Sequence, residues 1–412
     1  MIPVSARNIE FVGHTDQDGR GDGVQVMVHK GHAFVGHMFS DGFTITDVSD
    51  PRRPRPVSFV AAPPNSRAFH LQTHGDLLLT VNAPNIWVLQ GYSDPNDYFK
   101  ASITETFTKR EKTFTAGLRV LDISKPAEPR EIAFMPVDGL GLHRLWYVGG
   151  RYAYASCHWQ GFTDHVLAII DMAEPTRPEV VGRWWLPGTK QGDSEPPPVR
   201  HPEHADTGFR PHNTNVYPER PDRAYLGYID GGLVILDIAD KAHPKMVSRW
   251  DYHPPYFGFT HTVVPFFDRN LLIVSDECTR TEGQDWPKLV WIVDGRAETN
   301  PVPISTCPLP PLANFMRQGA RYGAHNLYEN LPKPNAWKSD RIVLGTYFNG
   351  GLRAYDTSNP YQPQEVGYFV PEPPARAPSG AIQINDVFVD ERQVVYTVDR
   401  HVGGLYTLEM EF

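Results

Sequence analysis

The sequence lacks the features that place a protein quickly in a functional class. It has only three cysteines, Cys157, Cys278 and Cys307, an odd number without metal-ligand spacing, so neither disulfides nor a cysteine metal site is implied. The net charge of −9 is accompanied by no basic run, which argues against nucleic-acid binding. No apolar stretch reaches transmembrane length, and residues 1–7 do not resemble a signal peptide. We therefore expect a cytoplasmic protein without a membrane partner.

Common catalytic signatures are also missing. The chain contains no His-Glu-x-x-His, no Gly-x-Ser-x-Gly, no Walker motif and no dinucleotide-binding fingerprint. Proline and glycine are plentiful, at 39 and 34 residues, and the aromatic content of 12% argues against disorder. The prolines and glycines are typical of turns between many short strands. Because none of the catalytic motifs above is present, candidate functional residues have to be sought at positions that recur along the chain.

One sequence motif recurs along the chain and consists of an apolar strand followed by an aspartate and a Pro-containing turn. We call this motif the repeated phrase. The first copy reads Gly-Phe-Thr-Ile-Thr-Asp-Val-Ser-Asp-Pro. Repetition at a period near 50 to 70 residues indicates stacked or radial β units. The copies cover residues 42–51, 117–126, 167–175, 232–244, 289–301 and 351–360, and a weaker seventh covers 404–409.

Each copy has two strand-like runs before it and one after it. Four antiparallel strands per unit describe a propeller blade, whereas a β-sandwich has no need for the same phrase in every unit. We therefore predict an all-β, seven-bladed β-propeller in a single domain, residues 1–412. Its blades are predicted near 23–62, 69–137, 141–187, 210–255, 259–310, 322–373 and 382–411.

The last predicted blade has only three strands before the chain ends. Residues 7–14 resemble the outer strand at 364–369, so an N-terminal strand is expected to complete this blade. Such closure removes the exposed strand edges that invite aggregation.

The repeated phrase resembles a known family. Gly-Leu-x-Ile-x-Asp-Ile-Ser-x-Pro, preceded by strands such as Tyr152-Ala-Tyr154, is similar to the repeat of LVIVD-repeat proteins. The resemblance covers nearly all of the chain and implies a β-propeller. It carries little information on function, because fold alone does not supply function.

Histidines occur at the head of the first strand in five consecutive blades. The first strand of a propeller blade is innermost, so these positions are expected to form a ring at one mouth of the channel. Imidazoles that converge in this way can hold a first-row transition metal, here Fe, Zn, Mn or Cu, whereas calcium prefers oxygen ligands. Alternatively, the histidines are structural and bond the neighbouring blade or channel water. The predicted metal ligands are His70, His143, His212, His261 and His325, the last three with the best alignment, and Asn385 and Val24 take the position in blades seven and one.

Long insertions are concentrated on the face where these strand heads emerge. Functional loops on a rigid frame are the usual arrangement, so we expect a ligand site there. The insertions are at 83–115, 189–209, 278–288 and 308–321.

Three polar residues near this mouth are candidate catalytic residues: Glu277, His158 and Arg321. Glu277 can ligate the metal, orient a ligating histidine or act as a base. Asp276 is expected to face the opposite side of its strand, so that Asp276→Asn would be a mild change. The repeated aspartates are different, because an Asp before such a turn caps its own turn amides. These structural aspartates are Asp47, Asp122, Asp171, Asp237, Asp294 and Asp356.

Three functions remain open at this point. We expect a His-ligated metalloenzyme of the oxidoreductase or oxygenase type that acts on a small organic molecule. In arrangement only, this resembles the four-His iron centre of the seven-bladed carotenoid oxygenases. The alternatives are a metal-assisted hydrolase or lyase at the same site, and a non-enzymatic propeller that binds a ligand or a protein.

Overall fold

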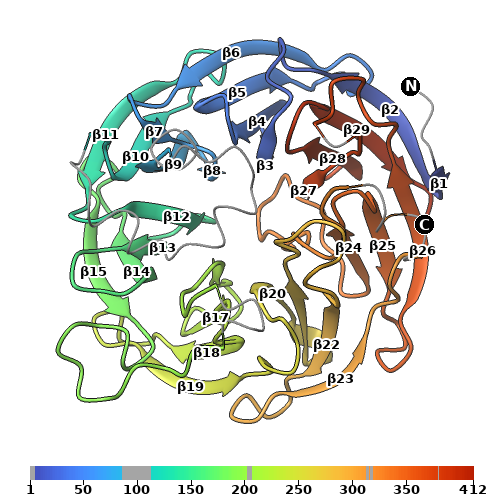
Figure 1. Cartoon of the computed structure of the whole chain (residues 1–412). Coiled ribbons are helices and arrows are strands. Elements are labelled where there is room, and N and C mark those ends of the chain that lie inside the picture. The colour runs from blue at the N-terminus through green and yellow to red at the C-terminus, as the bar shows by residue number, and fades with distance from the viewer. Residues whose placement is uncertain (1–4, 86–112, 202–206, 312–314, 316–318, 379) are drawn as a thin grey trace.

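Seven antiparallel sheets are arranged around a common axis in the computed structural model, as the repeats predict (Figure 1). The structure describes residues 5–85, 113–201, 207–311, 315, 319–378 and 380–412. In each sheet the strands follow the chain from the axis outward, except that the outermost strands of the last two blades come from the N-terminal segment (Figure 1). The predicted seven-bladed all-β fold is confirmed.

The first four blades follow one another along the chain. Blade one consists of β3 (Gly23–His29), β4 (His32–His37), β5 (Gly42–Asp47) and β6 (Arg55–Ala61). Blade two consists of β7 (Ser66–Arg67), β8 (Leu71–His74), β9 (Leu77–Pro84), β10 (Gly117–Asp122) and β11 (Arg130–Pro136). Blade three consists of β12 (Gly141–Trp146), β13 (Tyr152–His158), β14 (Val166–Asp171) and β15 (Glu179–Trp184). Blade four consists of β16 (Thr214–Asn215), β17 (Arg223–Gly227), β18 (Leu233–Asp237) and β19 (Lys245–Trp250).

The last three blades include the two strands from the start of the chain. Blade five consists of β20 (Thr260–Phe266), the 3₁₀ turn η2 (Phe267–Arg269), β21 (Leu271–Asp276), β22 (Val290–Asp294) and β23 (Val302–Thr306). Blade six consists of β24 (Ile342–Thr346), β25 (Leu352–Asp356), β26 (Gln364–Val370) and β1 (Ser5–Arg7). Blade seven consists of β27 (Ile384–Val389), β28 (Val394–Asp399), β29 (Leu405–Met410) and β2 (Ile9–Thr15).

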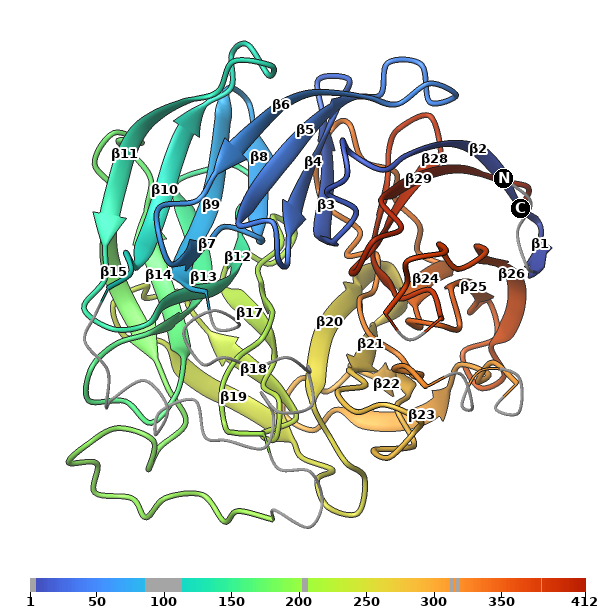
Figure 2. The ribbon, with the colours of Figure 1, turned by 45° about the horizontal axis from the view of Figure 1, so that its top comes forward.

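The ring is closed by the N-terminal segment, as predicted. β2 pairs antiparallel with β29 from Ile9↔Met410 to Thr15↔Leu405 and so forms the outer strand of blade seven. β1 pairs with β26 at the rim of blade six, which the sequence did not indicate. Asn8, which connects the two strands, has a φ of 53° and donates a side-chain hydrogen bond to the Val366 carbonyl. One segment therefore joins the last two blades (Figure 2).

The aspartate of the repeated phrase fixes the turn that follows each third strand. In all six full copies, Oδ1 accepts the backbone N–H two residues further on, at 2.7–3.0 Å. The predicted structural role of these aspartates is confirmed. They are Asp47, Asp122, Asp171, Asp237, Asp294 and Asp356.

The three cysteines are buried free thiols. Burial raises the pKa of the Cys157 and Cys278 thiols well above the usual value and that of Cys307 as well, so all three are protonated at neutral pH. In the described part of the chain, no helix combines the length and the apolar character needed to cross a membrane.

Candidate metal centre

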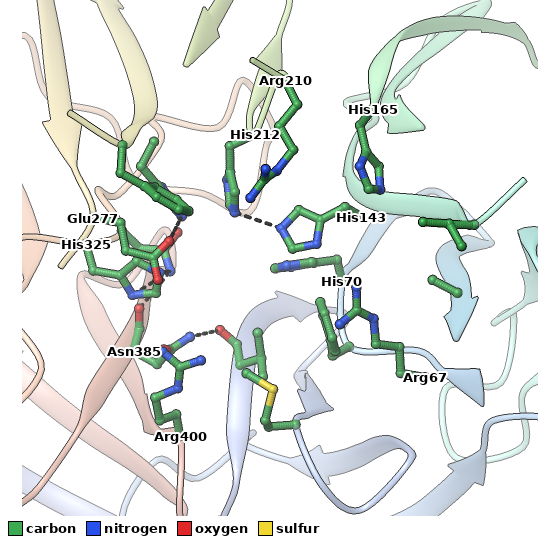
Figure 3. A pocket seen from close by; sticks show the side chains of 18 of the residues that line it. Arg67, His70, His143, His165, Arg210, His212, Glu277, His325, Asn385 and Arg400 are labelled. Carbon is green, nitrogen blue, oxygen red and sulfur yellow. Dashed lines mark hydrogen bonds and ion pairs between the residues drawn. The ribbon is translucent and has the colours of Figure 1, made fainter. Parts of the chain in front are cut away.

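One residue from each blade lines a single cavity on the propeller axis (Figure 3). The cavity has a volume of about 80 Å³, enough for several water molecules, since one water needs about 10–15 Å³. The structure therefore brings all five predicted histidines together. The seven equivalent residues are Val24, His70, His143, His212, His261, His325 and Asn385.

A β-bulge directs four of these side chains toward the axis. The pairing of the first and second strands skips one residue at the same place in blades one, three, five and seven. A bulge leaves its extra residue outside the ladder and re-aims its side chain. The skipped residues are Val24, His143, His261 and Asn385.

The other three histidines precede or replace a regular inner strand. His70 lies one residue before β8, and His212 lies two residues before the short strand β16. His325 belongs to a segment that was predicted as the first strand of blade six. That segment instead pairs with its neighbours only through isolated bridges, and the His325 N–H donates to the Thr346 carbonyl at 2.9 Å. Because these three positions lie outside a regular inner strand, the alternation of side chains between the two faces of a sheet does not apply to them. Their imidazoles can therefore point toward the axis.

The preceding blade holds the backbone of several of these residues in place. Hydroxyl groups on second strands donate to carbonyls of the next blade: Ser275 to His325 at 2.8 Å and Thr346 to Asn385 at 3.0 Å. Glycine takes the same place in blade four, because a Cβ at Gly227 would lie 2.1 Å from the His261 carbonyl oxygen. These small second-strand residues therefore set how close the backbone of His261, His325 and Asn385 comes to the preceding blade.

Gly227→Ala tests this close approach. We expect the added methyl group to displace the His261 backbone and to lower the free energy of unfolding by about 1–3 kcal/mol, as overpacking typically does. Gly295→Ala is the matched control, since its nearest contact would be the flexible Leu272 side chain at 3.3 Å. Urea denaturation of both variants is the measurement. Equal stability of the two variants would contradict the positioning role of Gly227.

The five imidazoles form an arc rather than a regular ring. The Nε2 atoms of His143 and His212 are 2.8 Å apart. The rings of His212 and His261 are tilted by 34° with centroids 3.7 Å apart, and the His325 ring follows at 4.7 Å from that of His261. His70 begins the arc, 5.2 Å from His143.

Glu277 faces the far end of this arc (Figure 3). Its Oε2 lies 3.8 Å from His261 Nε2, and its Oε1 lies 3.5 Å from His325 Nε2. Arg321 Nη1 donates to Oε1 at 3.3 Å. The backbone N–H of Glu277 donates to the Phe259 carbonyl at 2.9 Å, which fixes the residue just beyond β21. The carboxylate is buried and oriented between two ring nitrogens and a guanidinium.

Asp276 does not have the inert environment expected from strand alternation. It is fully buried and accepts hydrogen bonds from the Tyr252 hydroxyl, the Leu289 N–H at 3.0 Å and the Trp291 indole at 3.3 Å. Burial raises its pKa to about 6. Asp276 does lie away from the cavity, but Asp276→Asn would disturb a buried network, so the expectation of a mild effect is withdrawn.

A buried hydrogen-bond network assigns the protons of two histidines. Asn213 donates its amide to Glu329, so its Oδ1 is left to accept the Nδ1–H of His212 at 2.7 Å. This puts the lone pair of His212 on Nε2, where it accepts the Nε2–H of His143 at 2.8 Å. Arg144 donates to Glu329 at 3.3 Å and to His70 Nδ1 at 3.1 Å, which places the His70 proton on Nε2. His212 therefore carries its lone pair on the cavity side, where it accepts from His143, whereas His70 carries a proton on Nε2.

Burial keeps the histidines neutral. Desolvation lowers the pKa of all five imidazoles well below the usual value of 6.5. Neutral imidazole is the form that binds metal ions. Burial also raises the pKa of Glu277, while Arg321 and then Arg400 act in the opposite direction.

His158 does not lie with the other candidates. It is buried at the end of β13, where its Nδ1 accepts the Leu140 N–H at 3.2 Å, and it is not among the described residues that line the cavity. His165, whose ring centroid is 5.8 Å from that of His158, lines the cavity instead. The predicted catalytic role of His158 therefore has no support from its position.

Three arginines were missed by the sequence interpretation: Arg67, Arg210 and Arg400. With Arg321 they line the same cavity as the histidines. A signal was present, because an arginine precedes His70 by three residues, His212 by two and His325 by four. Arg400 follows Asp399 at the end of β28 and is not close in sequence to any of the five predicted histidines.

The insertions are only partly described. Ala83 and Pro84 from the first insertion and Arg321 from the last line the cavity. Trp286, in the insertion at 278–288, stacks on Tyr322 with an interplanar angle of 11°. The remaining predictions for these loops fall on residues 86–112, 202–206, 312–314 and 316–318, which lie outside the described residues.

Comparisons with known proteins support the fold. The model of the LVIVD repeat matches residues 20–60, 113–134 and 222–251. The β-propeller domain of Myceliophteria thermophila Cps50 (Swd1) is similar in structure, with a TM-score of 0.55, 10% identity, and coverage of 98% of this chain and 99% of that chain. A protein from Lactobacillus plantarum has a TM-score of 0.54 and 11% identity, with coverage of 99% and 96%. No curated protein matches the sequence. The chain therefore contains LVIVD repeats and has the fold of a seven-bladed β-propeller.

Proposed function

We propose that His212, His261 and Glu277 bind a divalent transition metal, and that the protein is a metal-dependent enzyme acting on a small organic molecule. The observation that carries this proposal is the Nε2 atom of His261, which is buried without a hydrogen-bond partner in the described structure. It faces Glu277 Oε2 at 3.8 Å, and one ligand atom from each of the three residues lies within 4.8 Å of the others. Buried polar atoms are normally satisfied, and a metal ion would satisfy this one.

The donor atoms fit a metal of this class. Metal–ligand bonds of about 2.1 Å place two ligand atoms about 3.4 Å apart at a tetrahedral angle, close to the spacing of Glu277 from His261 and His325. The Nε2 of His212 carries a lone pair, as its bond to Asn213 requires, and a metal ion bound there would replace the hydrogen bond from His143. His143 and His325 are further donors. His70 is better suited to donate a hydrogen bond to a ligand, because its Nδ1 accepts from Arg144.

The combination of two imidazoles and one carboxylate narrows the chemistry. This donor set is typical of non-haem Fe(II) oxygenases, and it also occurs in zinc hydrolases. The additional imidazoles in the arc suit iron or copper as well as zinc, and iron or copper would supply the redox chemistry of an oxidoreductase or oxygenase. A hydrolase or lyase is the second candidate, because zinc with the same three residues would activate water.

The residues around the donors would bind and orient the substrate. A bound ion would supply Lewis acidity or redox chemistry. Arg321 orients Glu277 through the contact between Nη1 and Oε1. Phe69, Leu140 and Phe259 form an apolar part of the wall, which would exclude water from a bound substrate.

We further propose that the protein works in the cytoplasm. Three buried cysteines that are all free thiols fit a reducing compartment. Measurement of free thiols in protein taken directly from cells would test this assignment.

Metal analysis of the purified protein tests the proposal. We expect wild-type protein to bind Fe, Mn, Cu or Zn stoichiometrically, and His261→Ala to lose at least about tenfold in metal affinity while the β fold is retained. His243→Ala is the control, since its side chain is 77% exposed on a turn. Wild-type protein that binds none of these ions, and gains no thermal stability from them, would instead indicate a non-enzymatic binding propeller.

The reaction class requires a separate experiment. Anaerobic reconstitution with Fe(II), followed by optical spectroscopy and oxygen uptake, should show a reactive iron site if the protein is an oxygenase. Hydrolysis of ester substrates by the zinc form, without oxygen uptake by the iron form, would favour the hydrolase.

A further inference from the structure

The walls of the cavity carry more positive than negative charge. Arg67, Arg210, Arg321 and Arg400 line it, whereas Glu277 is its only lining carboxylate among the described residues. In Figure 3, Arg67, Arg210 and Arg400 approach the histidines from different sides of the cavity. Each of the four arginines is at most 7% exposed. Buried guanidinium groups need anionic or hydrogen-bonding partners, because the loss of hydration is costly.

Two of these arginines have carboxylate partners. Arg210 donates to Asp164 at 2.9 Å, and Arg321 donates to Glu277 at 3.3 Å. Their charges are therefore largely balanced within the protein.

Arg400 is different. Its Nη1 is buried without a hydrogen-bond partner in the described structure, and the residue is 7% exposed. The neighbouring Asp399 does not hydrogen-bond to this guanidinium in the described structure, because its oxygens accept the backbone N–H groups of residues 383, 401, 402 and 403. Arg400 is thus a buried cation whose fork-shaped donor group faces the cavity.

Arg400 also lies next to the candidate metal centre. Its Cζ is 5.5 Å from the centroid of the Phe348 ring, and Arg321 Cζ is 5.6 Å from the same centroid. Phe348 in turn stacks on His325 at 4.7 Å. An anion held by Arg400 would therefore be close to His325 and Glu277.

We propose that this cavity binds a small organic carboxylate, whose carboxylate group is held by Arg400 and whose apolar part contacts Phe69, Leu140 and Met38. A guanidinium offers two parallel N–H groups that match a carboxylate in geometry and charge. The apolar lining favours an organic acid over an inorganic ion. The identification of this acid as the substrate rests on the proposed metal-dependent function, whereas its binding does not.

Calorimetric titration with acetate, benzoate and oxalate tests the inference, with benzamide as the uncharged analogue of benzoate. At least one carboxylate should bind to wild-type protein, and Arg400→Gln should weaken that binding about 10- to 100-fold. Arg400→Lys should bind with intermediate affinity, because lysine keeps the charge and loses the fork. Arg53→Gln, at an exposed turn residue, should bind like wild type.

Titrations of both metal-loaded and chelator-treated protein separate this inference from the proposed function. Carboxylate binding that depends on Arg400 in protein that takes up no metal would refute the metal site and retain the anion site. Failure of all three carboxylates to bind at millimolar concentration, or equal binding by wild type and Arg400→Gln, would overturn the inference. Tighter binding of inorganic phosphate than of every carboxylate would also overturn it. Circular dichroism of Arg400→Gln and Arg400→Lys checks that both variants fold.

Discussion

Replacement of Glu277 by glutamine is expected to lower metal affinity by about 10- to 100-fold or more. The amide keeps the size of the side chain but removes the negative charge. His261 and His325 approach this carboxylate at 3.8 and 3.5 Å, so either a direct ligand or a partner of two ligands is lost. Metal affinity by competition with a chromophoric chelator is the measurement.

Glu282→Gln is the appropriate control for this change. Glu282 is exposed and lies in the loop that follows Glu277, so its replacement alters the same net charge without touching the cavity. Asp276 does not serve this purpose, because its carboxylate holds Tyr252, Leu289 and Trp291.

The stability of metal-free protein distinguishes two roles of Glu277. If Glu277 only neutralises the buried Arg321, then Glu277→Gln will destabilise metal-free and metal-loaded protein equally. If Glu277 binds the metal, most of the lost stability will appear only when metal is present, because a ligand stabilises the state that binds it. Equal losses would contradict the metal-binding role.

The fold was largely predictable because each repeat encodes its own local structure. An apolar strand, an aspartate that accepts the N–H two residues on and a Pro-containing turn are short-range features, and six copies repeat them. The match between residues 7–14 and an outer strand extended this prediction to ring closure. The added pairing of β1 with blade six was not predictable, since it involves only three residues and no repeat.

The sequence also located the histidines, because they occupy equivalent positions in the repeats. It did not predict the orientation of their side chains. Equivalent positions in repeats converge on the axis whatever their exact orientation. The bulges at His143 and His261 decide that these side chains point inward, and no residue type in the sequence marks a bulge there. The same uncertainty misplaced His158, which lies at the end of a second strand with its ring bonded to Leu140.

The buried network behind the histidines depends on long-range contacts. Glu329 contacts Arg144 and Asn213 across three blades of the propeller, and these bonds set the tautomers of His70 and His212. The residue types gave no hint of this pairing, because the partners are separated by more than a hundred residues. Chemistry that depends on the position of a proton therefore required the structure.

Deletion of residues 1–16 is expected to destabilise the whole propeller by about 3–6 kcal/mol. The deletion exposes the edges of β29 and β26 together, because β2 pairs with the former and β1 with the latter. It also removes Ile9, which is buried against the apolar cluster shared by blades six and seven. The His14 ring bonds the Gly403 carbonyl at 2.6 Å, so a contact near the mouth of blade seven is lost as well. Thermal and urea denaturation measure the effect.

Relocation of the strand provides the control for this deletion. Residues 8–16 placed after Phe412 through a short Gly-Ser linker can pair with β29 as a hairpin, since Ile9 and Met410 are direct partners in the antiparallel ladder. We expect this variant to recover most of the lost stability, because the outer strand of blade seven is restored, and to fall short of wild type by the contribution of β1. A truncated protein that unfolds at the wild-type temperature, or a relocated strand that restores nothing, would show that the ring does not depend on this closure.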